Sequence, residues 1–125
     1  MAEHNVYGEW GELVAIDHLR AEGYIILDRN WRNLEGYELD IVARKDRLIV
    51  FVEVKTRRNE DLMRATEAIT FTKVKHIVRA ASSYMLFHRL KLDIRFDVIT
   101  VVGQEPDPEV THLEDAFSVP PSWQR

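Results

Sequence analysis

The segment Leu48–Val54, which reads LIVFVEV, limits the possible folds of this chain more than any other segment. Its residues are apolar on both faces of an extended strand, which predicts a strand in the middle of a sheet that is covered on both sides. Its only polar residue is Glu53. Because burying an unpaired carboxylate costs several kcal/mol, we expect Glu53 to have a cationic partner or to lie at the mouth of the strand.

The chain on either side of Lys45-Asp46 predicts a β-hairpin. Glu38 and Asp40 alternate with apolar residues, so both acids face the same way. With Lys45 and Asp46 as a two-residue turn, Glu38 would lie opposite Glu53, and the three acids would share a face with Lys55. Carboxylates crowded in this way repel one another unless a divalent cation lies among their oxygens. The hairpin therefore predicts a metal site.

A helix is expected from about Tyr7 to Glu22, with Asn5 as its N-cap and Gly23 as its end. Apolar residues recur along one face at helical spacing, and Glu12 occupies a position in this stripe where an apolar residue would be expected. We therefore expect its carboxylate to face inward. It could instead cap a backbone group or pair with a lysine across the core.

The remaining segments read mainly as scaffold. A long helix is expected from Thr66 or Thr70 to about His88, with three basic residues on its exposed face that could grip phosphates or could simply be solvated. Trp31 could stack on a base, but anchoring a polar loop to the core is the commoner use of such an aromatic, and Asp97 is more plausibly structural than catalytic. The other expected segments are a strand at 24–27, that polar loop at 29–36, a strand at 94–102 and an extended piece at 110–113.

Length and composition set the class of protein. A chain of 125 residues suits one domain over residues 1–125, with a flexible end at about 118–125. We expect no membrane association and a cytoplasmic location, because there is no long apolar run, no secretory signal and no cysteine. The five histidines lack the paired spacing of a zinc site.

Charge is unevenly distributed along the chain. The net charge of −4 argues against a nucleic-acid partner, but residues 44–79 carry ten basic and five acidic groups, whereas the segments before and after have net charges of −6 and −3. Basic clusters at 44–47 and 55–58 flank the central strand. They could track a phosphate backbone, or they could be ordinary solvated strand ends.

An ordered set of short motifs carries a family resemblance. The motifs are Gly11-Glu12 with Ala15, Arg29–Arg32, Glu38–Ile41, Phe51–Arg57, Glu67-Ala68-Ile69 with Lys73, Arg95–Val98 and Asp115–Phe117. Together they resemble the YraN-like family of predicted endonucleases, and through it the PD-(D/E)xK nuclease superfamily, which includes restriction enzymes and archaeal Holliday-junction resolvases. One departure concerns the glycine that usually precedes the Glu-x-Asp segment, because Tyr37 stands there and the glycine is Gly36.

The resemblance implies a restriction-endonuclease-like α/β fold with a central mixed β-sheet flanked by helices. It also implies that Asp40 and Glu53 bind Mg²⁺ or Mn²⁺, with Glu12 as a further ligand, directly or through water, and Glu38 as a less certain neighbour. Lys55 would orient the attacking water or neutralise charge on the phosphate. The residues expected to bind nucleic acid are Arg57, Arg58, Lys73, Lys75 and Arg79.

Three functions remain open at this point. The first is a metal-dependent endonuclease acting on DNA, for which a symmetric homodimer would suit cleavage of two strands. The second is a noncatalytic nucleic-acid-binding module with the same fold. The third is a protein-interaction scaffold whose acidic flanks dock a basic partner.

Glu38 also has a purely structural interpretation, as a charge on an edge strand paired with Arg57 or Arg44.

Overall fold

The computed structural model describes residues 2–59, 69–117 and 119, with the side chains of residues 2–5 left aside. In this part of the chain, five strands form one sheet in the order β1-β2-β3-β4-β5, together with two helices. Strands β3 and β4 are parallel and the other neighbours are antiparallel, so the sheet is mixed. The elements are α1 (Ala2–Ala21), β1 (Ile25–Arg32), β2 (Glu38–Lys45), β3 (Leu48–Arg57), α3 (Phe71–Phe87), β4 (Asp93–Val102) and β5 (Glu109–Leu113).

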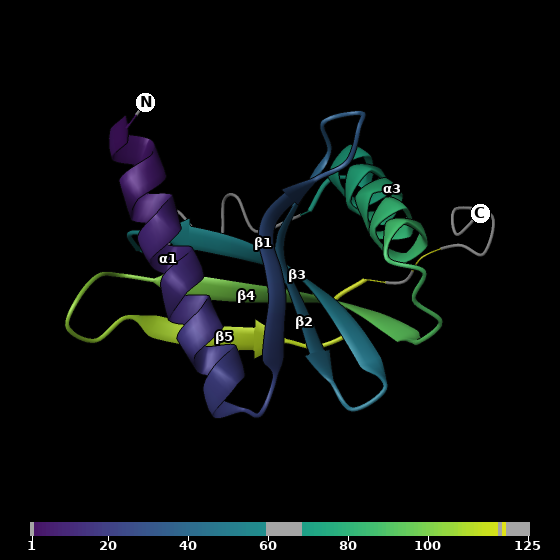
Figure 1. The fold of residues 1–125 in the computed structure, drawn as a ribbon. Coiled ribbons are helices and arrows are strands. Elements are labelled where there is room, and N and C mark those ends of the chain that lie inside the picture. Colours follow the sequence, from purple (N-terminus) through teal and green to yellow (C-terminus); the bar gives the residue numbers. More distant parts are fainter. Residues whose placement is uncertain (1, 60–68, 118, 120–125) are drawn as a thin grey trace.

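The two helices cover opposite faces of this sheet (Figure 1). On one face, Leu19 of α1 packs in a cluster with Val50 and Val52 of β3. On the other, Tyr84 of α3 packs in a cluster with Phe51. The central strand is thus apolar on both faces because both are covered. The predicted α/β fold, with a mixed sheet flanked by helices, is confirmed and is consistent with a restriction-endonuclease-like architecture.

Helix α1 differs from the prediction at its start and agrees at its end. It begins at Ala2, so Asn5 lies inside the helix and does not cap it. It ends before Gly23, whose φ of 94° suits glycine. The amides of Tyr24 and Gly23 donate to the carbonyls of Leu19 and Arg20, at 3.0 Å each, which is the Schellman arrangement.

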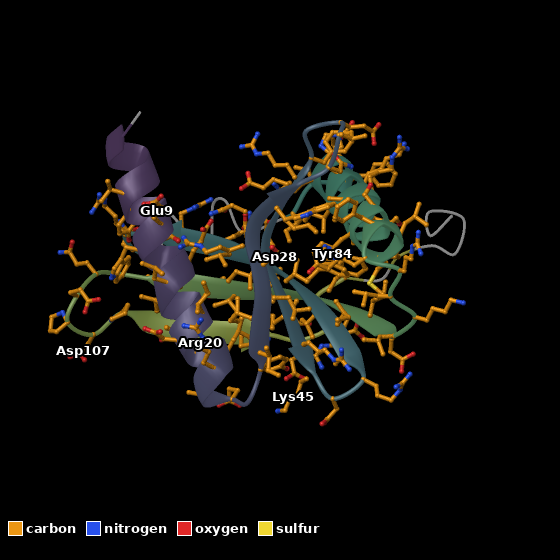
Figure 2. All side chains as sticks on the ribbon, in the orientation of Figure 1. Glu9, Arg20, Asp28, Lys45, Tyr84 and Asp107 are labelled. Atoms are coloured by element: carbon orange, nitrogen blue, oxygen red, sulfur yellow. The ribbon has the colours of Figure 1, made fainter. Side chains whose placement is uncertain are left out.

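Strand β1 is longer than predicted. It continues through Arg32 and takes in the first half of the segment expected to be a polar loop. Because β1 is an edge strand, its polar side chains reach solvent without leaving the sheet. Trp31 therefore lies in a strand, where its ring packs edge-on against the ring of Tyr84, with the two ring centroids 5.1 Å apart. The Tyr84 hydroxyl also donates to Asp28 Oδ2 at 2.7 Å, which ties α3 to β1 (Figure 2).

The hairpin that joins β2 to β3 has a different register from the predicted one. Lys45 pairs with Leu48 and Ile41 with Val52, so the turn residues are Asp46 and Arg47. Asp46 has a φ of 54°, a left-handed conformation that Asp tolerates better than most residues. The ladder is displaced by two residues, and Glu38 therefore does not lie opposite Glu53.

The second half of the described chain agrees closely with the sequence. Thr70 caps α3, because its side chain accepts a hydrogen bond from the amide of Lys73. Strands β4 and β5 occupy the two predicted segments. Neither described helix is long and apolar enough to cross a membrane. Thr66, Glu67, Ala68 and most of the predicted flexible end at 118–125 lie outside the described residues.

Candidate metal and catalytic site

Asp40 lies where β2 and β3 separate. The ladder between these strands ends at the pair Ile41 and Val52, and beyond it the amide of Val54 donates to Asp40 Oδ2 at 2.9 Å. The alternation of side chains is also interrupted here, because Leu39 belongs to the cluster beneath α3 and Ile41 to the cluster beneath α1. Asp40 is therefore placed at the opening between two strands rather than squarely on one face.

Three acids from three elements line one hollow at this opening. Glu12 comes from α1, Asp40 from β2 and Glu53 from β3, and the hollow has a volume of about 330 Å³. The hollow therefore brings together the three carboxylates to which the family resemblance gave the main metal-binding roles.

A close approach between α1 and β3 positions Glu12. A Cβ atom added at Gly11 would overlap the side chain of Thr56, lying 2.8 Å from its Cγ2 and 2.9 Å from its Cβ. Only glycine fits this contact without a shift of the backbone. Gly11 thus lets the helix lie directly against the end of β3, and the next residue, Glu12, reaches the hollow.

Two of the three acids have basic partners. Arg29 of β1 lies 3.2 Å from Glu12, and Lys73 of α3 lies 3.5 Å from Glu53. The expectation that Glu53 has a cationic partner or lies at the mouth of its strand is confirmed by the pair with Lys73, and the Glu53 side chain is only 10% exposed. The partner of Glu12 is an arginine on the neighbouring strand, not a lysine across the core.

The third acid, Asp40, is held in an unfavourable electrostatic position. Burial and the nearby carboxylate of Glu53 raise the pKa of Asp40 to about 8, although the hydrogen bond from the Val54 amide acts in the opposite direction. Glu12 raises this pKa further and Lys73 lowers it. Two carboxylates that disfavour each other's charge are a combination that a bound cation would relieve.

Glu38 lies at the margin of the site. Its carboxylate is 3.4 Å from the guanidinium of Arg32 in β1. Glu38 therefore pairs with Arg32, and not with Arg57 or Arg44, the partners considered from the sequence. Glu38 lines a second hollow of about 390 Å³, together with Glu12 and Asp40. Glu38 therefore lies next to the three-acid hollow but is not one of the residues that line it.

Lys55 lies on the same face of β3 as Glu53, two residues further along the strand. It lines a neighbouring hollow whose walls are mostly apolar and include Val74, Val98 and Phe117. Within the described residues, no hydrogen bond or ion pair engages its ammonium group. The structure therefore places Lys55 beside the acids without joining it to them.

The residues expected to bind nucleic acid occupy two regions. Arg57 and Arg58 end β3 or follow it, and the Arg58 guanidinium lies 4.3 Å from the centroid of the Tyr7 ring. Lys75 is exposed on α3, whereas Arg79 pairs with Glu35 at 3.0 Å. All three basic residues predicted on α3, including Lys73, are exposed to solvent.

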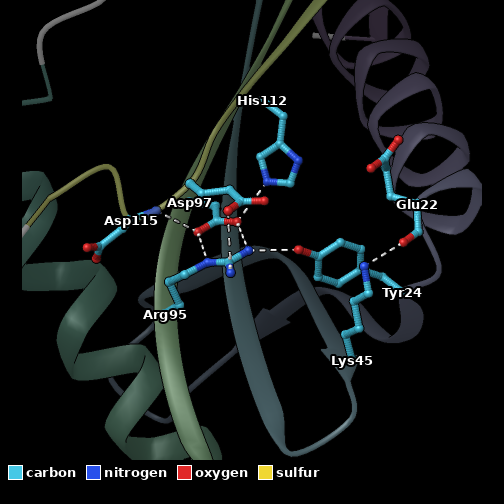
Figure 3. A network of polar contacts seen from close by, with 8 residues as sticks. Glu22, Tyr24, Lys45, Arg95, Asp97, His112 and Asp115 are labelled. Atoms are coloured by element: carbon cyan, nitrogen blue, oxygen red, sulfur yellow. Dashed lines mark hydrogen bonds and ion pairs between the residues drawn. The ribbon is translucent and has the colours of Figure 1, made fainter.

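A network of polar contacts that was not identified from the sequence surrounds Asp97. Arg95 donates two hydrogen bonds to Asp97 at 2.8 Å, His112 lies 2.7 Å from it, and the Asp115 amide donates to it at 3.0 Å (Figure 3). Arg95 also donates to the hydroxyl of Tyr24. The Arg-x-Asp spacing on one strand was the available signal, because side chains two residues apart share a face. These contacts support a structural role for Asp97.

The donor set of the three-acid hollow fits a hard divalent cation in kind, since carboxylate oxygens are the ligands that Mg²⁺ and Mn²⁺ prefer. As the side chains stand, however, the described residues contain no three His, Asp or Glu arranged to hold one ion. Two of the three carboxylates are instead engaged in ion pairs, Glu12 with Arg29 and Glu53 with Lys73.

Comparison with known proteins decides the family. Residues 11–101 match the profile of Uncharacterised protein family UPF0102. The chain belongs to this family. A UPF0102 protein of Bacteroides thetaiotaomicron is 44% identical and covers 96% of this chain and 98% of its own length. UPF0102 proteins of Syntrophotalea carbinolica and Myxococcus xanthus are 48% and 40% identical, covering 90% and 93% of this chain and 91% and 92% of their own lengths. The resemblance to the YraN-like family that was drawn from the motifs is confirmed.

Proposed function

We propose that this UPF0102 protein is a metal-dependent nuclease that hydrolyses phosphodiester bonds of DNA. The observation that supports this most is the meeting of Glu12, Asp40 and Glu53, from three separate elements, in one hollow at the end of β3. A lysine follows on the same face of that strand, two residues beyond Glu53. Acids and a lysine in this order suit the chemistry of phosphate hydrolysis.

Each group has a distinct role in the proposed reaction. Asp40 and Glu53 would hold Mg²⁺ or Mn²⁺, with Glu12 as a further ligand or a hydrogen-bond acceptor for a water molecule. Such an ion supplies Lewis-acid polarisation of the phosphodiester and favours deprotonation of water. Lys55 would neutralise charge that develops on the phosphate, and its lack of a partner in the described structure leaves it available for this role.

Basic residues around the hollow would hold the rest of the substrate. Lys75 is exposed on α3, and Arg57 and Arg58 lie at the end of β3. Contacts from such residues to phosphates position a strand without reading its sequence. We therefore propose cleavage that depends on the shape of the DNA rather than on its sequence.

The test is incubation of the purified protein with duplex, branched and single-stranded DNA in the presence of Mn²⁺. Cleavage should be lost in Lys55→Ala and in Asp40→Asn. It should persist in Lys91→Ala, a matched loss of one charge at an exposed lysine far along the chain. Equal cleavage by parent, Lys55→Ala and Asp40→Asn would point to a contaminating nuclease and would count against the proposal.

A noncatalytic nucleic-acid-binding module is the second candidate. The ion pairs of Glu12 with Arg29 and of Glu53 with Lys73 favour it, because they give two of the acids a structural use without any metal. Calorimetric titration with Mn²⁺ separates the two functions. A nuclease should bind the ion and lose that binding in Asp40→Asn, whereas a binding module should bind DNA in a salt-dependent manner with no metal requirement.

A further inference from the structure

Beside the three-acid hollow, two aromatic rings and an arginine form a compact stack. The rings of Tyr7 and Trp10, one turn apart on α1, are stacked with centroids 5.5 Å apart and planes 18° apart. The guanidinium of Arg58, which follows β3, lies 4.3 Å from the Tyr7 centroid. Planar groups from two elements thus form one surface, which we call the aromatic–arginine stack.

Both rings are fixed from a third element, the loop that follows β4. The Tyr7 hydroxyl donates to the carbonyl of Gly103 at 2.6 Å, and the Trp10 indole nitrogen donates to Glu105 at 2.7 Å. Rings held in this way before a ligand arrives lose little conformational entropy when it binds. The arrangement is therefore preorganised.

The stack is open to solvent. It borders a hollow of about 440 Å³, and Tyr7 and Trp10 are only half-buried. Arg58 is exposed, and no acid of the described part of the chain pairs with it. An exposed cation that pairs with no acid among the described residues, and that rests on an aromatic face, suits a ligand that is both flat and negatively charged.

The stack is also continuous with the proposed catalytic site. Tyr7 lines both hollows, the one that holds the stack and the one lined by the three acids. Tyr7 and Glu12 are five residues apart on α1, about 7.5 Å along the helix axis. One ligand could therefore place a phosphate at the acids and a flat group at the stack.

We propose that Tyr7, Trp10 and Arg58 bind an unpaired base of the strand whose phosphate lies at the three acids. This inference rests on the proposed function and names its substrate class. In a duplex both faces of each base are covered by neighbouring bases, so the stack can receive a base only from a single strand or from an unpaired position next to the cleavage point. Because every base has a π-face, the site would not select a sequence.

The first test is equilibrium binding without divalent metal, measured by fluorescence anisotropy with a labelled single strand of thymidine nucleotides and with a duplex of the same length. Trp10→Ala and Arg58→Ala should each weaken single-strand binding by about ten-fold, the effect of losing one stacked base, and change duplex binding less. Arg58→Lys separates charge from stacking, because it keeps the charge and loses the plane. Phe87→Ala, which removes an exposed aromatic on α3, is the control and should change neither.

The second test links the ring to one base. Binding is measured with a series of strands that each lack one base, at a different position in each strand. Removal of the base at one position should weaken binding by the parent but not by Trp10→Ala. Trp10→Phe keeps an aromatic ring and should recover most of the binding and of the sensitivity to the abasic position, which separates loss of stacking from loss of folding. Purely additive effects of the abasic position and Trp10→Ala would overturn the stack.

These assays do not depend on cleavage, so the two proposals can fail separately. A parent that cleaves DNA but shows no coupling between Trp10 and a base overturns the stack and leaves the nuclease. A parent that shows the coupling but never cleaves overturns the nuclease and leaves the stack. Equal affinity of the parent for single strand and duplex, unchanged in the variants, also overturns the stack.

Discussion

The ammonium group of Lys73 lies 3.5 Å from the carboxylate of Glu53, and this ion pair connects the first turn of α3 to the centre of the sheet. Lys73 thereby supplies to Glu53 the positive charge that a metal ion would otherwise supply. A divalent cation bound as we propose would therefore compete with Lys73 for the same carboxylate. Arg29 stands in the same relation to Glu12, at 3.2 Å.

Lys73→Met should therefore tighten Mn²⁺ binding, by on the order of ten-fold, because the ion no longer displaces a cation from Glu53. The same change should lower the free energy of unfolding of the metal-free protein by roughly 1 kcal/mol, since the pair is partly exposed. Calorimetry and chemical denaturation measure the two effects. Lys75→Met removes the same charge two residues away and should do neither. Unchanged metal affinity in Lys73→Met would contradict the competition.

Gly11→Ala should destabilise the protein by about 1–3 kcal/mol, because the added methyl group would overlap Thr56 and push α1 away from β3. Gly8→Ala is the matched control on the same helix. A Cβ at Gly8 meets nothing within 4 Å, so the better helix propensity of alanine should leave stability unchanged or raise it. Urea denaturation of the two variants checks the difference. Similar stability of both would show that the helix does not depend on the close approach.

The two-residue error in the hairpin register shows why the site was predictable although its geometry was not. Side chains alternate with a period of two, so a shift of two residues moves Asp40 toward Glu53 in place of Glu38, although the paired ladder stops one residue short of both acids, at Ile41 and Val52. The alternation had placed Asp40 on the same face as Glu53, whereas Glu12 came from its place in the helical stripe and from the family resemblance. The turn that sets the register depends on a left-handed Asp46, and the Lys-Asp-Arg sequence carries no strong preference for it.

Contacts between distant segments could not be predicted from the sequence, because they depend on how the elements pack in space. The need of Glu53 for a cation followed from the cost of burial, but the identity of Lys73 depends on where α3 crosses the sheet. The polar residues of β1 looked like a loop because an edge strand may expose them, and pattern alone does not separate the two. Because Arg29 was assigned to a loop, the sequence did not identify it as the partner of Glu12.

Asp40→Asn should change how stability depends on pH in the presence of a chelator. The pKa of Asp40 is raised from 3.8 to about 8, so over this range the folded state keeps a proton that the unfolded state has released. This group therefore makes the free energy of unfolding fall as pH rises, by at most about 1.4 kcal/mol per pH unit. Asparagine cannot ionise, so the variant should lack this fall and be more stable than the parent above pH 8.

Denaturation at a series of pH values provides the measurement. Glu38→Gln is the control, because it removes a neighbouring carboxylate that is paired with Arg32 and lies outside the three-acid hollow. Its pH profile should follow that of the parent. If the profile of Asp40→Asn also ran parallel to the parent's, the strained position assigned to Asp40 would be wrong.

Asp97→Asn should lower the free energy of unfolding at neutral pH by about 3 kcal/mol, because it removes the fully buried carboxylate to which the partly buried guanidinium of Arg95 donates two hydrogen bonds. Burial acts to raise the pKa of Asp97, but the hydrogen bonds from Arg95, His112 and the Asp115 amide outweigh it and hold the pKa below its usual value. A lowered pKa contributes stability above the pKa of the unfolded chain, and this contribution is lost as pH falls through the folded value. The difference in free energy of unfolding between parent and variant should therefore shrink in acid.

Asp93→Asn, at the exposed start of the same strand, is the control and should show no such difference. DNA cleavage per folded molecule should survive in both variants. A selective loss of cleavage in fully folded Asp97→Asn would instead place Asp97 in the catalytic site.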